Sequence, residues 1–280
     1  MLILLLLIPV ATGVLLFSAY SSATRLPRNR PDRFLSEKNS DHKVIACLGD
    51  SLTHGTVSYN YVEALEKSYK GKQVSLVNAG VNSDLAYNLL QRIDPVIHCK
   101  PSLVTVLIGT NDVNAVLCEN GHEQYKAKQL PQRPDIEWYE DQLRQTVQKL
   151  KQSTSASIAL ISPPIMGENM TGETHGKVGQ YGEIVRKIAQ EEAVEYLPLF
   201  EEMTAVVKQA GMQQQGFARQ DWAKTKVKAV FRRFVLGQSF NKIGLSMGYY
   251  LLSDGIHLNE RGGEILQRLV NGFIVEHLKD

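Results

Sequence analysis

Five short apolar segments, separated by longer amphipathic ones, place the strongest constraint on the fold of this chain. They span residues 43–49, 74–81, 103–109, 157–164 and 193–200. Most are continuously apolar rather than alternating, as expected for parallel strands that are buried on both faces of a sheet. Helix-like patterns fill the intervals, at residues 57–69, 83–98, 135–152, 176–192 and 261–278. This alternation predicts βαβ units with right-handed crossovers and an α/β fold in three α/β/α layers.

The N-terminal residues 1–23 have the composition of a membrane anchor or a signal segment. Leu2 to Tyr20 carries no charge and is about long enough to cross a bilayer. A cleaved signal peptide is the alternative, because Ala19 and Ser21 would suit a cleavage site. No basic residue precedes the apolar run, however, and several arginines follow it between residues 25 and 33. The positive-inside rule therefore favours an uncleaved single-pass anchor with the folded domain on the cytosolic side.

The opposite orientation has one argument in its favour, the glycosylation sequon that begins at Asn169. That triplet would suit a secreted or lumenal domain, so both locations stay open. Residues 24–42 are polar and contain two prolines, which predicts a linker. Residues 43–280 then form a single domain. The net charge of +2 gives no reason to expect a nucleic-acid partner, and three scattered cysteines predict neither a disulfide framework nor a metal site.

Polar, glycine-bearing sequences follow three of the predicted strands. Gly49-Asp50-Ser51 ends the first strand, Asn78-Ala79-Gly80 ends the second, and Gly109-Thr110-Asn111-Asp112 ends the third. In open parallel sheets, functional residues gather at the carboxyl ends of the strands. We therefore expect these segments to lie together, with Ser51 as a candidate nucleophile.

A serine nucleophile needs a base, and the base needs a group that orients it. His257 follows Asp254 by three residues, just before the C-terminal helix. On one tight loop, the Asp254 carboxylate can reach one imidazole nitrogen and leave the other facing Ser51. A helix-capping or surface histidine is the alternative for His257. His54, one turn after Ser51, is a weaker alternative that could line the pocket or, less readily, serve as the base.

The candidate donors for an oxyanion are two backbone amides and one side chain. Ser51 would begin a helix, so its own N–H is free and lies at the positive end of the helix dipole. Gly80 has no side chain to obstruct its N–H, and Asn111 carries a neutral amide. Each also has an alternative role as a turn residue. Ser83 is expected to cap the following helix, and Asp50 and Asp112 are expected to hold loops through backbone hydrogen bonds.

The segments GDSLTHG, NAG, GTND and DGIH resemble, in order, the four sequence blocks of the SGNH, or GDSL-type, hydrolase superfamily. The resemblance covers about residues 43 to 275 and is closest in pattern to the small lysophospholipase and arylesterase branch. It implies a flavodoxin-like sheet of five parallel strands and ester hydrolysis without metal or cofactor. It also implies that Ser51 is the nucleophile, that Ser51, Gly80 and Asn111 supply the oxyanion donors, and that Asp254 orients His257 as the base.

The region of about residues 205–250 is longer than a compact member of that superfamily needs. It is rich in lysine and arginine and contains Trp222, Phe231 and Phe234 at near-helical spacing. Such a basic amphipathic helix is typical of a membrane-surface segment or a lid. A helix that packs on the core with a solvated basic face is the alternative.

These observations predict a serine hydrolase that cleaves lysophospholipid-like or other lipid acyl esters through an acyl-enzyme. Membrane association would come from the N-terminal segment and the basic insertion. A carbohydrate acetyl-esterase and an acyltransferase would use the same machinery and remain alternatives. A non-catalytic scaffold is disfavoured, because none of the expected site residues is missing from the sequence.

Overall fold

The computed structural model describes residues 18–37, 42–117, 119–211, 215–217 and 219–278. Within them the strands form a single parallel sheet in the order β2-β1-β3-β4-β5. The strands are β1 (Lys43–Gly49), β2 (Val74–Gly80), β3 (Leu103–Leu107), β4 (Ser157–Ile161) and β5 (Glu195–Leu197). This is the strand order of the flavodoxin-like fold, so the predicted five-stranded parallel sheet is confirmed.

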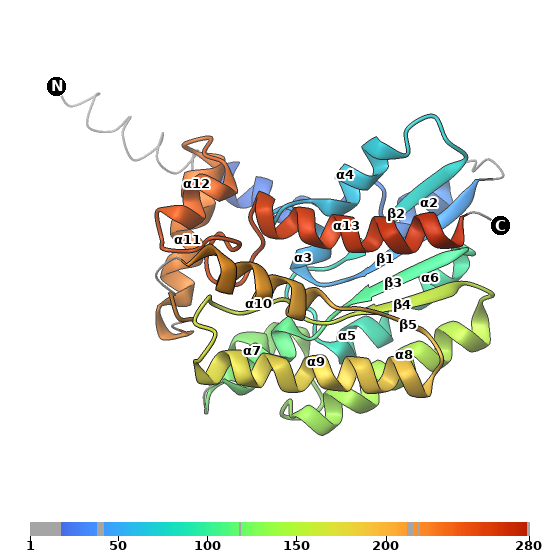
Figure 1. The fold of residues 1–280 in the computed structure, drawn as a ribbon. Coiled ribbons are helices and arrows are strands. Elements are labelled where there is room, and N and C mark those ends of the chain that lie inside the picture. The colour runs from blue at the N-terminus through green and yellow to red at the C-terminus, as the bar shows by residue number, and fades with distance from the viewer. Residues whose placement is uncertain (1–17, 38–41, 118, 212–214, 218, 279–280) are drawn as a thin grey trace.

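Helices cover both faces of the sheet (Figure 1). One face carries α5 (Ala86–Gln91), α6 (Asp94–His98), α8 (Ile136–Ser153) and α9 (Glu173–Glu191). The other carries α4 (Tyr61–Ser68), α10 (Leu199–Ala210) and α13 (Glu260–His277). The remaining elements are α2 (Pro31–Ser36), α3 (Ser51–His54), α7 (Thr110–Val116), the 3-10 helix η1 (Gly121–Lys128), α11 (Arg219–Phe234) and α12 (Phe240–Leu245).

The central strands divide the interior into two apolar cores. In β1, Val44, Ala46 and Leu48 face the core under α8 and α9. Ile45 and Cys47 alternate with them and face the core under α4 and α13. Successive side chains of a strand point to opposite faces, so a strand buried on both sides must be apolar at every position. This is the physical origin of the continuous apolar runs in the sequence.

The segment 83–98 was predicted as one helix, but the structure divides it into α5 and α6. Pro95 lies in the first turn of α6, where its missing N–H costs no hydrogen bond. Inside a continuous helix the same proline would remove a hydrogen bond and clash with the preceding turn. The predicted N-cap role of Ser83 is also wrong, because α5 begins at Ala86 with Leu85 at its N-cap.

Most of the predicted N-terminal anchor, residues 1–17, lies outside the described residues. Within the described part of the chain, no helix combines the length and the apolar composition needed to span a membrane. The segment predicted as a polar linker contains α2 and lies against the edge strand β2. The Asn29 side chain donates to the Leu76 carbonyl at 2.9 Å, and the Asn29 carbonyl accepts from the Asn78 N–H at 3.0 Å. These bonds cover part of an otherwise open sheet edge.

Candidate active site

Ser51 is the first residue of α3 and is separated from the end of β1 by one residue. Asp50 is the N-cap of this short helix, and its Oδ1 accepts the Leu52 N–H at 2.9 Å. The Ser51 side chain is bonded to His257, with 3.0 Å between Oγ and Nε2. The two residues are 206 positions apart in the sequence, so only the tertiary fold brings them together.

His257 is held in the orientation that a general base requires. Its Nδ1 lies 2.7 Å from Asp254 Oδ2, and both side chains are almost fully buried. If Nδ1–H donates to the carboxylate, Nε2 is left as the acceptor for the Ser51 hydroxyl. Burial alone would raise the pKa of Asp254, but the adjacent imidazole and the backbone N–H groups of Ile256 and His257 overcome it and lower the pKa. The carboxylate therefore stays ionised beside the imidazole.

Hydrogen bonds to backbone N–H groups fix the conformation of the loop that carries Asp254 and His257. Asp254 Oδ1 accepts the N–H groups of Ile256 and His257 at 3.0 and 2.9 Å. Gly255 has a φ of 93°, a conformation that residues with a side chain rarely adopt. Upstream, the buried Glu168 carboxylate accepts the N–H groups of three successive residues, Tyr250, Leu251 and Leu252. Glu168 thus ties the loop after β4 to the segment that positions His257, a role that the sequence did not indicate.

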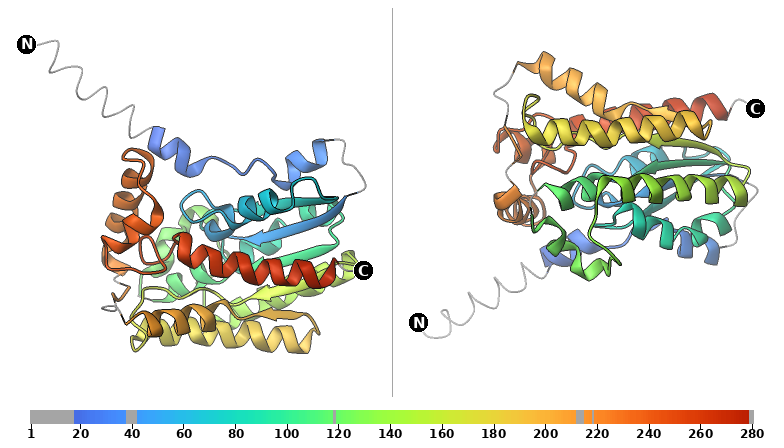
Figure 2. Two further views of the ribbon diagram at one scale, coloured as in Figure 1. Left: turned by 45° about the horizontal axis from the view of Figure 1, so that its top comes forward. Right: turned by 90° about the horizontal axis from the view of Figure 1, so that it is seen from below.

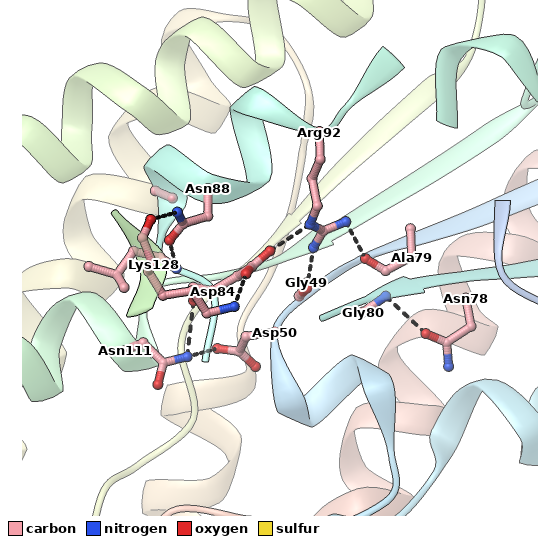
Figure 3. Close-up of polar contacts among 12 residues, drawn as sticks. Gly49, Asp50, Asn78, Ala79, Gly80, Asp84, Asn88, Arg92, Asn111 and Lys128 are labelled. Carbon is pink, nitrogen blue, oxygen red and sulfur yellow. Dashed lines mark hydrogen bonds and ion pairs between the residues drawn. The ribbon is translucent and has the colours of Figure 1, made fainter. Parts of the chain in front are cut away.

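The structure does not support the predicted role of Gly80 as an oxyanion donor. Its N–H donates to Asn78 Oδ1 at 3.0 Å, as Figure 3 shows. A Cβ at position 80 would come within 2.1 Å of the His54 backbone nitrogen. Glycine is therefore required here because α3 packs directly against the end of β2. The residue positions the helix that begins with Ser51.

Ser83, three residues after Gly80, is a better candidate for a backbone donor to an oxyanion. It lines the same cavity as Ser51, together with its neighbour Asn82. Its φ is 63°, which is uncommon for a residue with a side chain. Among the described residues, its backbone N–H has no protein acceptor, and the same holds for the Ser51 N–H. Strained backbone conformations at the wall of a cavity are a feature of functional sites. No motif in the sequence distinguished Ser83 from an ordinary turn residue.

Asn111 lies beside Asp50, next to Ser51. Its side-chain Nδ2 donates to Asp50 Oδ2 at 3.2 Å and to the Asp84 carbonyl at 3.0 Å (Figure 3). Its Oδ1 accepts from the Tyr125 hydroxyl at 3.0 Å. Both amide hydrogens are thus engaged in this structure. An oxyanion would gain a hydrogen bond from Asn111 only by replacing one of these two acceptors.

Arg92 connects the strand ends that surround the site. Its guanidinium donates to the carbonyls of Gly49 and Ala79, both at 2.9 Å, and pairs with the Asp84 carboxylate (Figure 3). Lys128 forms a second ion pair with Asp84 at 2.6 Å. Planar guanidinium groups suit such multidentate contacts. Arg92 therefore fixes the ends of β1 and β2 relative to the loop that contains Ser83.

Two buried carboxylates around the site are held by backbone hydrogen bonds, as predicted. Burial raises the pKa of Asp50 to about 7, and repulsion from Asp84 adds to this effect. Burial likewise raises the pKa of Asp112 to about 8, while its carboxylate accepts the Ala86 N–H at 3.2 Å.

His54, the alternative candidate base, contacts Thr56, and burial lowers the pKa of its imidazole to about 4. The imidazole that Ser51 contacts is that of His257.

A cavity of about 880 Å³ opens onto Ser51. Its wall includes Ala19 and Ala23 from the N-terminal segment, and Val230 and Phe231 from α11. Figure 2 shows the segment of residues 18–24 beside α11 and α12, at the carboxyl end of the sheet. The Ala23 carbonyl accepts from the Thr56 hydroxyl at 2.7 Å, which attaches this segment to the domain. No group of three or more metal-ligating side chains among the described residues is arranged to hold a metal ion.

Comparisons with known proteins agree with this architecture. The sequence model of the GDSL-like Lipase/Acylhydrolase family matches residues 47–265. Among solved structures, the acetylxylan esterase Axe2 from Geobacillus stearothermophilus is 22% identical, with 84% of this chain and 95% of that chain covered and a TM-score of 0.55. The acetyl xylan esterase AlAXEase is 20% identical, with 82% and 99% covered and a TM-score of 0.57. None of the curated proteins matches the sequence.

The likeness to the two esterases is one of fold, because their sequence identity to this chain is low. The family match is of a different kind, since it covers most of the chain and includes Ser51 and Asp254-to-His257. The chain therefore belongs to the GDSL-like lipase/acylhydrolase family and is a carboxylic ester hydrolase.

Proposed function

We propose that this protein cleaves acyl esters of amphiphilic, lipid-like alcohols, with Ser51, His257 and Asp254 as its catalytic triad. The observation that supports this proposal most is the position of the Ser51 hydroxyl. It is hydrogen-bonded to His257 at 3.0 Å and opens onto a cavity whose wall is rich in alanine, valine and aromatic side chains. Such a cavity suits an acyl chain, because apolar surface gains free energy when it leaves water.

The geometry suggests the following sequence of steps. Ser51 Oγ attacks the ester carbonyl while His257 Nε2 accepts its proton. The backbone amides of Ser51 and Ser83 donate to the oxyanion, and Asn111 contributes if it exchanges one of its present acceptors. His257 then protonates the departing alcohol, which leaves an acyl-enzyme. Water, activated by the same imidazole, attacks that ester and releases the acid and the free serine.

We also propose that substrate reaches the cavity from a membrane surface. Tyr20 and Val227 line the cavity, and each is 68% exposed. Phe231 lines it as well and is 41% exposed. Exposed aromatic and aliphatic side chains beside lysines are typical of segments that lie on lipid headgroups. The apolar sequence of residues 2–17 directly precedes the segment that lines the cavity, so an anchor there would hold the cavity near lipid.

Removal of acetyl groups from a carbohydrate is the second candidate function. The structures of similar fold are described as acetylxylan esterases, but at 20–22% identity the likeness carries over the fold alone. A carbohydrate site would be expected to present many hydrogen-bonding groups, whereas apolar side chains dominate the wall of this cavity. Transfer of the acyl group to an alcohol instead of water would use the same acyl-enzyme.

A substrate comparison with one matched control tests the proposal. Wild-type protein, Ser51→Ala and the control Ser68→Ala, which changes an exposed serine of α4, would each be assayed on a lysophospholipid and on acetylated xylo-oligosaccharides. We expect hydrolysis of the lysophospholipid by the wild type and the control, and loss of activity by at least about a thousandfold in Ser51→Ala. Cleavage of the acetylated sugar alone would favour the second candidate. Undiminished activity in Ser51→Ala would refute the triad.

A further inference from the structure

Lys226 is a charged residue of α11 in the wall of the apolar cavity onto which Ser51 opens. It lines the cavity together with Ser51 and is partly buried. Its ammonium lies 5.1 Å from the centroid of the Trp222 ring. That ring is in turn 6.4 Å from the ring of His257. The Trp222 ring is therefore near both the ammonium and the imidazole of the proposed base.

This ammonium has no carboxylate partner among the described residues. Burial lowers the pKa of Lys226, and Asp254 opposes this shift through its charge without contacting the amine. Both carboxylate oxygens of Asp254 are already engaged, by the His257 imidazole and by backbone N–H groups. A cation in an apolar cavity is costly unless an anion accompanies it. The face of Trp222 offers only a cation–π contact, which is weaker than a charge-assisted hydrogen bond.

We infer that Lys226 is the binding site for an anionic group, a phosphate or a carboxylate, on the substrate whose ester carbonyl lies at Ser51. This inference rests on the proposed function, and it narrows the substrate class to acyl esters with a negatively charged alcohol portion. The apolar wall formed by Ala19, Ala23 and Phe231 would hold the acyl chain. Lys226 would hold the charged end of the alcohol portion.

The choice of Lys226 over its neighbours follows from burial. Lys224 and Lys228 also line the cavity, but both side chains are exposed. Exposed ammonium groups are strongly hydrated and screened by salt, so they contribute to general attraction rather than to a defined contact. A partly buried ammonium forms stronger hydrogen bonds with an anion because the surrounding dielectric is lower.

The test compares two monomeric substrates that differ in a single charged group. One is 1-hexanoyl-glycerol 3-phosphate and the other is 1-hexanoylglycerol, and their short chains avoid micelles that would bind any basic surface. A third substrate, the hexanoyl ester of a hydroxycarboxylic acid, distinguishes a phosphate from a carboxylate. The proteins are the wild type, Lys226→Met, Lys226→Arg and Lys242→Gln. Lys242 is an exposed residue of α12 that does not line the cavity, so its substitution changes the net charge alone.

In the wild type we expect a higher kcat/KM for an anionic substrate than for the neutral one. In Lys226→Met the ratio of anionic to neutral kcat/KM should fall about ten- to a hundredfold, mainly through KM, which corresponds to the loss of one charge-assisted hydrogen bond. Lys226→Arg should restore most of the ratio, and Lys242→Gln should leave it unchanged.

Two results would overturn the inference. One is an equal loss for anionic and neutral substrates in Lys226→Met, because Lys226 would then act on the triad rather than on the substrate. The other is an equal change of the ratio in Lys242→Gln, because the effect would then be one of net charge. If the wild type hydrolysed none of the three esters, the proposed function itself would fail, so the two failures are distinguishable.

Discussion

Replacing Asp254 with asparagine tests how the site holds His257. The carboxylate is buried, and its Oδ2 lies 2.7 Å from His257 Nδ1. Its Oδ1 accepts two backbone N–H groups at 3.0 and 2.9 Å. An asparagine would keep its carbonyl oxygen on these two donors, because the amide nitrogen cannot accept them. The new NH₂ group would then face Nδ1 and force it to become an acceptor.

The consequence for catalysis is large. With Nδ1 as an acceptor, the imidazole proton moves to Nε2, which then can no longer take the proton from Ser51 Oγ at 3.0 Å. The same change of tautomer in a serine protease lowers kcat by about 10⁴-fold, which corresponds to about 5 kcal/mol of transition-state stabilisation. We expect a loss of that order in Asp254→Asn. Because size and backbone hydrogen bonds are retained, the free energy of unfolding should change by no more than about 2 kcal/mol at pH 7.

The assay is hydrolysis of a short-chain nitrophenyl ester, with kcat and KM measured separately. Asp32→Asn is the matched control, since the Asp32 side chain is 67% exposed and forms an ion pair with Arg30 rather than with a residue of the triad. Circular dichroism and thermal unfolding would show that both variants are folded. If folded Asp254→Asn retained more than about a tenth of the wild-type kcat, the assignment of Asp254 as the residue that orients His257 would be wrong.

Three further predictions concern residues around the triad. Gly80→Ala should displace α3, because the new Cβ would meet the His54 backbone at 2.1 Å; we expect kcat to fall by on the order of a hundredfold, and an unchanged kcat would show that the close packing is dispensable. Ser83→Gly should retain activity, because the φ of 63° at this position suits glycine. Ser83→Val introduces a β-branched residue that disfavours this φ, and it should lower kcat at least about tenfold. Equal kinetics of the two variants would argue against a functional amide at this position. Because the pKa of Asp112 is raised from 3.8 to about 8, the folded state binds a proton more tightly than the unfolded state, and stability should fall as pH rises between these values. In denaturant unfolding from pH 5 to 8, Asp112→Asn should reduce this slope by up to about 1.4 kcal/mol per pH unit, and an identical slope in both proteins would contradict the raised pKa.

The parallel sheet and the alternation of strands and helices were predictable, because a strand that is buried on both faces is apolar along its whole length. A strand such as β1 must be apolar at every position, and this is visible in residues 43–49 without knowledge of any neighbour. The segments after the strands were also recognisable, because polar residues and glycines there interrupt the apolar runs. Ser51, Asp254 and His257 could therefore be proposed from their residue types, their spacing and the resemblance to a known family.

The proposed donors to the oxyanion were not predictable in the same way. Gly80 was chosen because it is a glycine after a strand, but the structure uses it to bring α3 against β2. Ser83 looks like a turn residue in the sequence, and only its positive φ and its place in the cavity distinguish it. Every residue except proline carries the same backbone N–H group, so the residue type does not show where that group points. Its direction depends on the geometry of the surrounding turn. The same is true of Glu168, whose role depends on three amides more than eighty residues away.

The sequence by itself determined the parallel sheet, the layers of helices and the types of side chain at the strand ends. These follow from hydrophobic periodicity and turn composition, which act over a few neighbouring residues. Only the tertiary structure decided which groups contact Ser51, and that Ser83 and Lys226 line the same cavity as Ser51. Those relations join residues that are distant in the chain, and they arise from the packing of whole elements against one another.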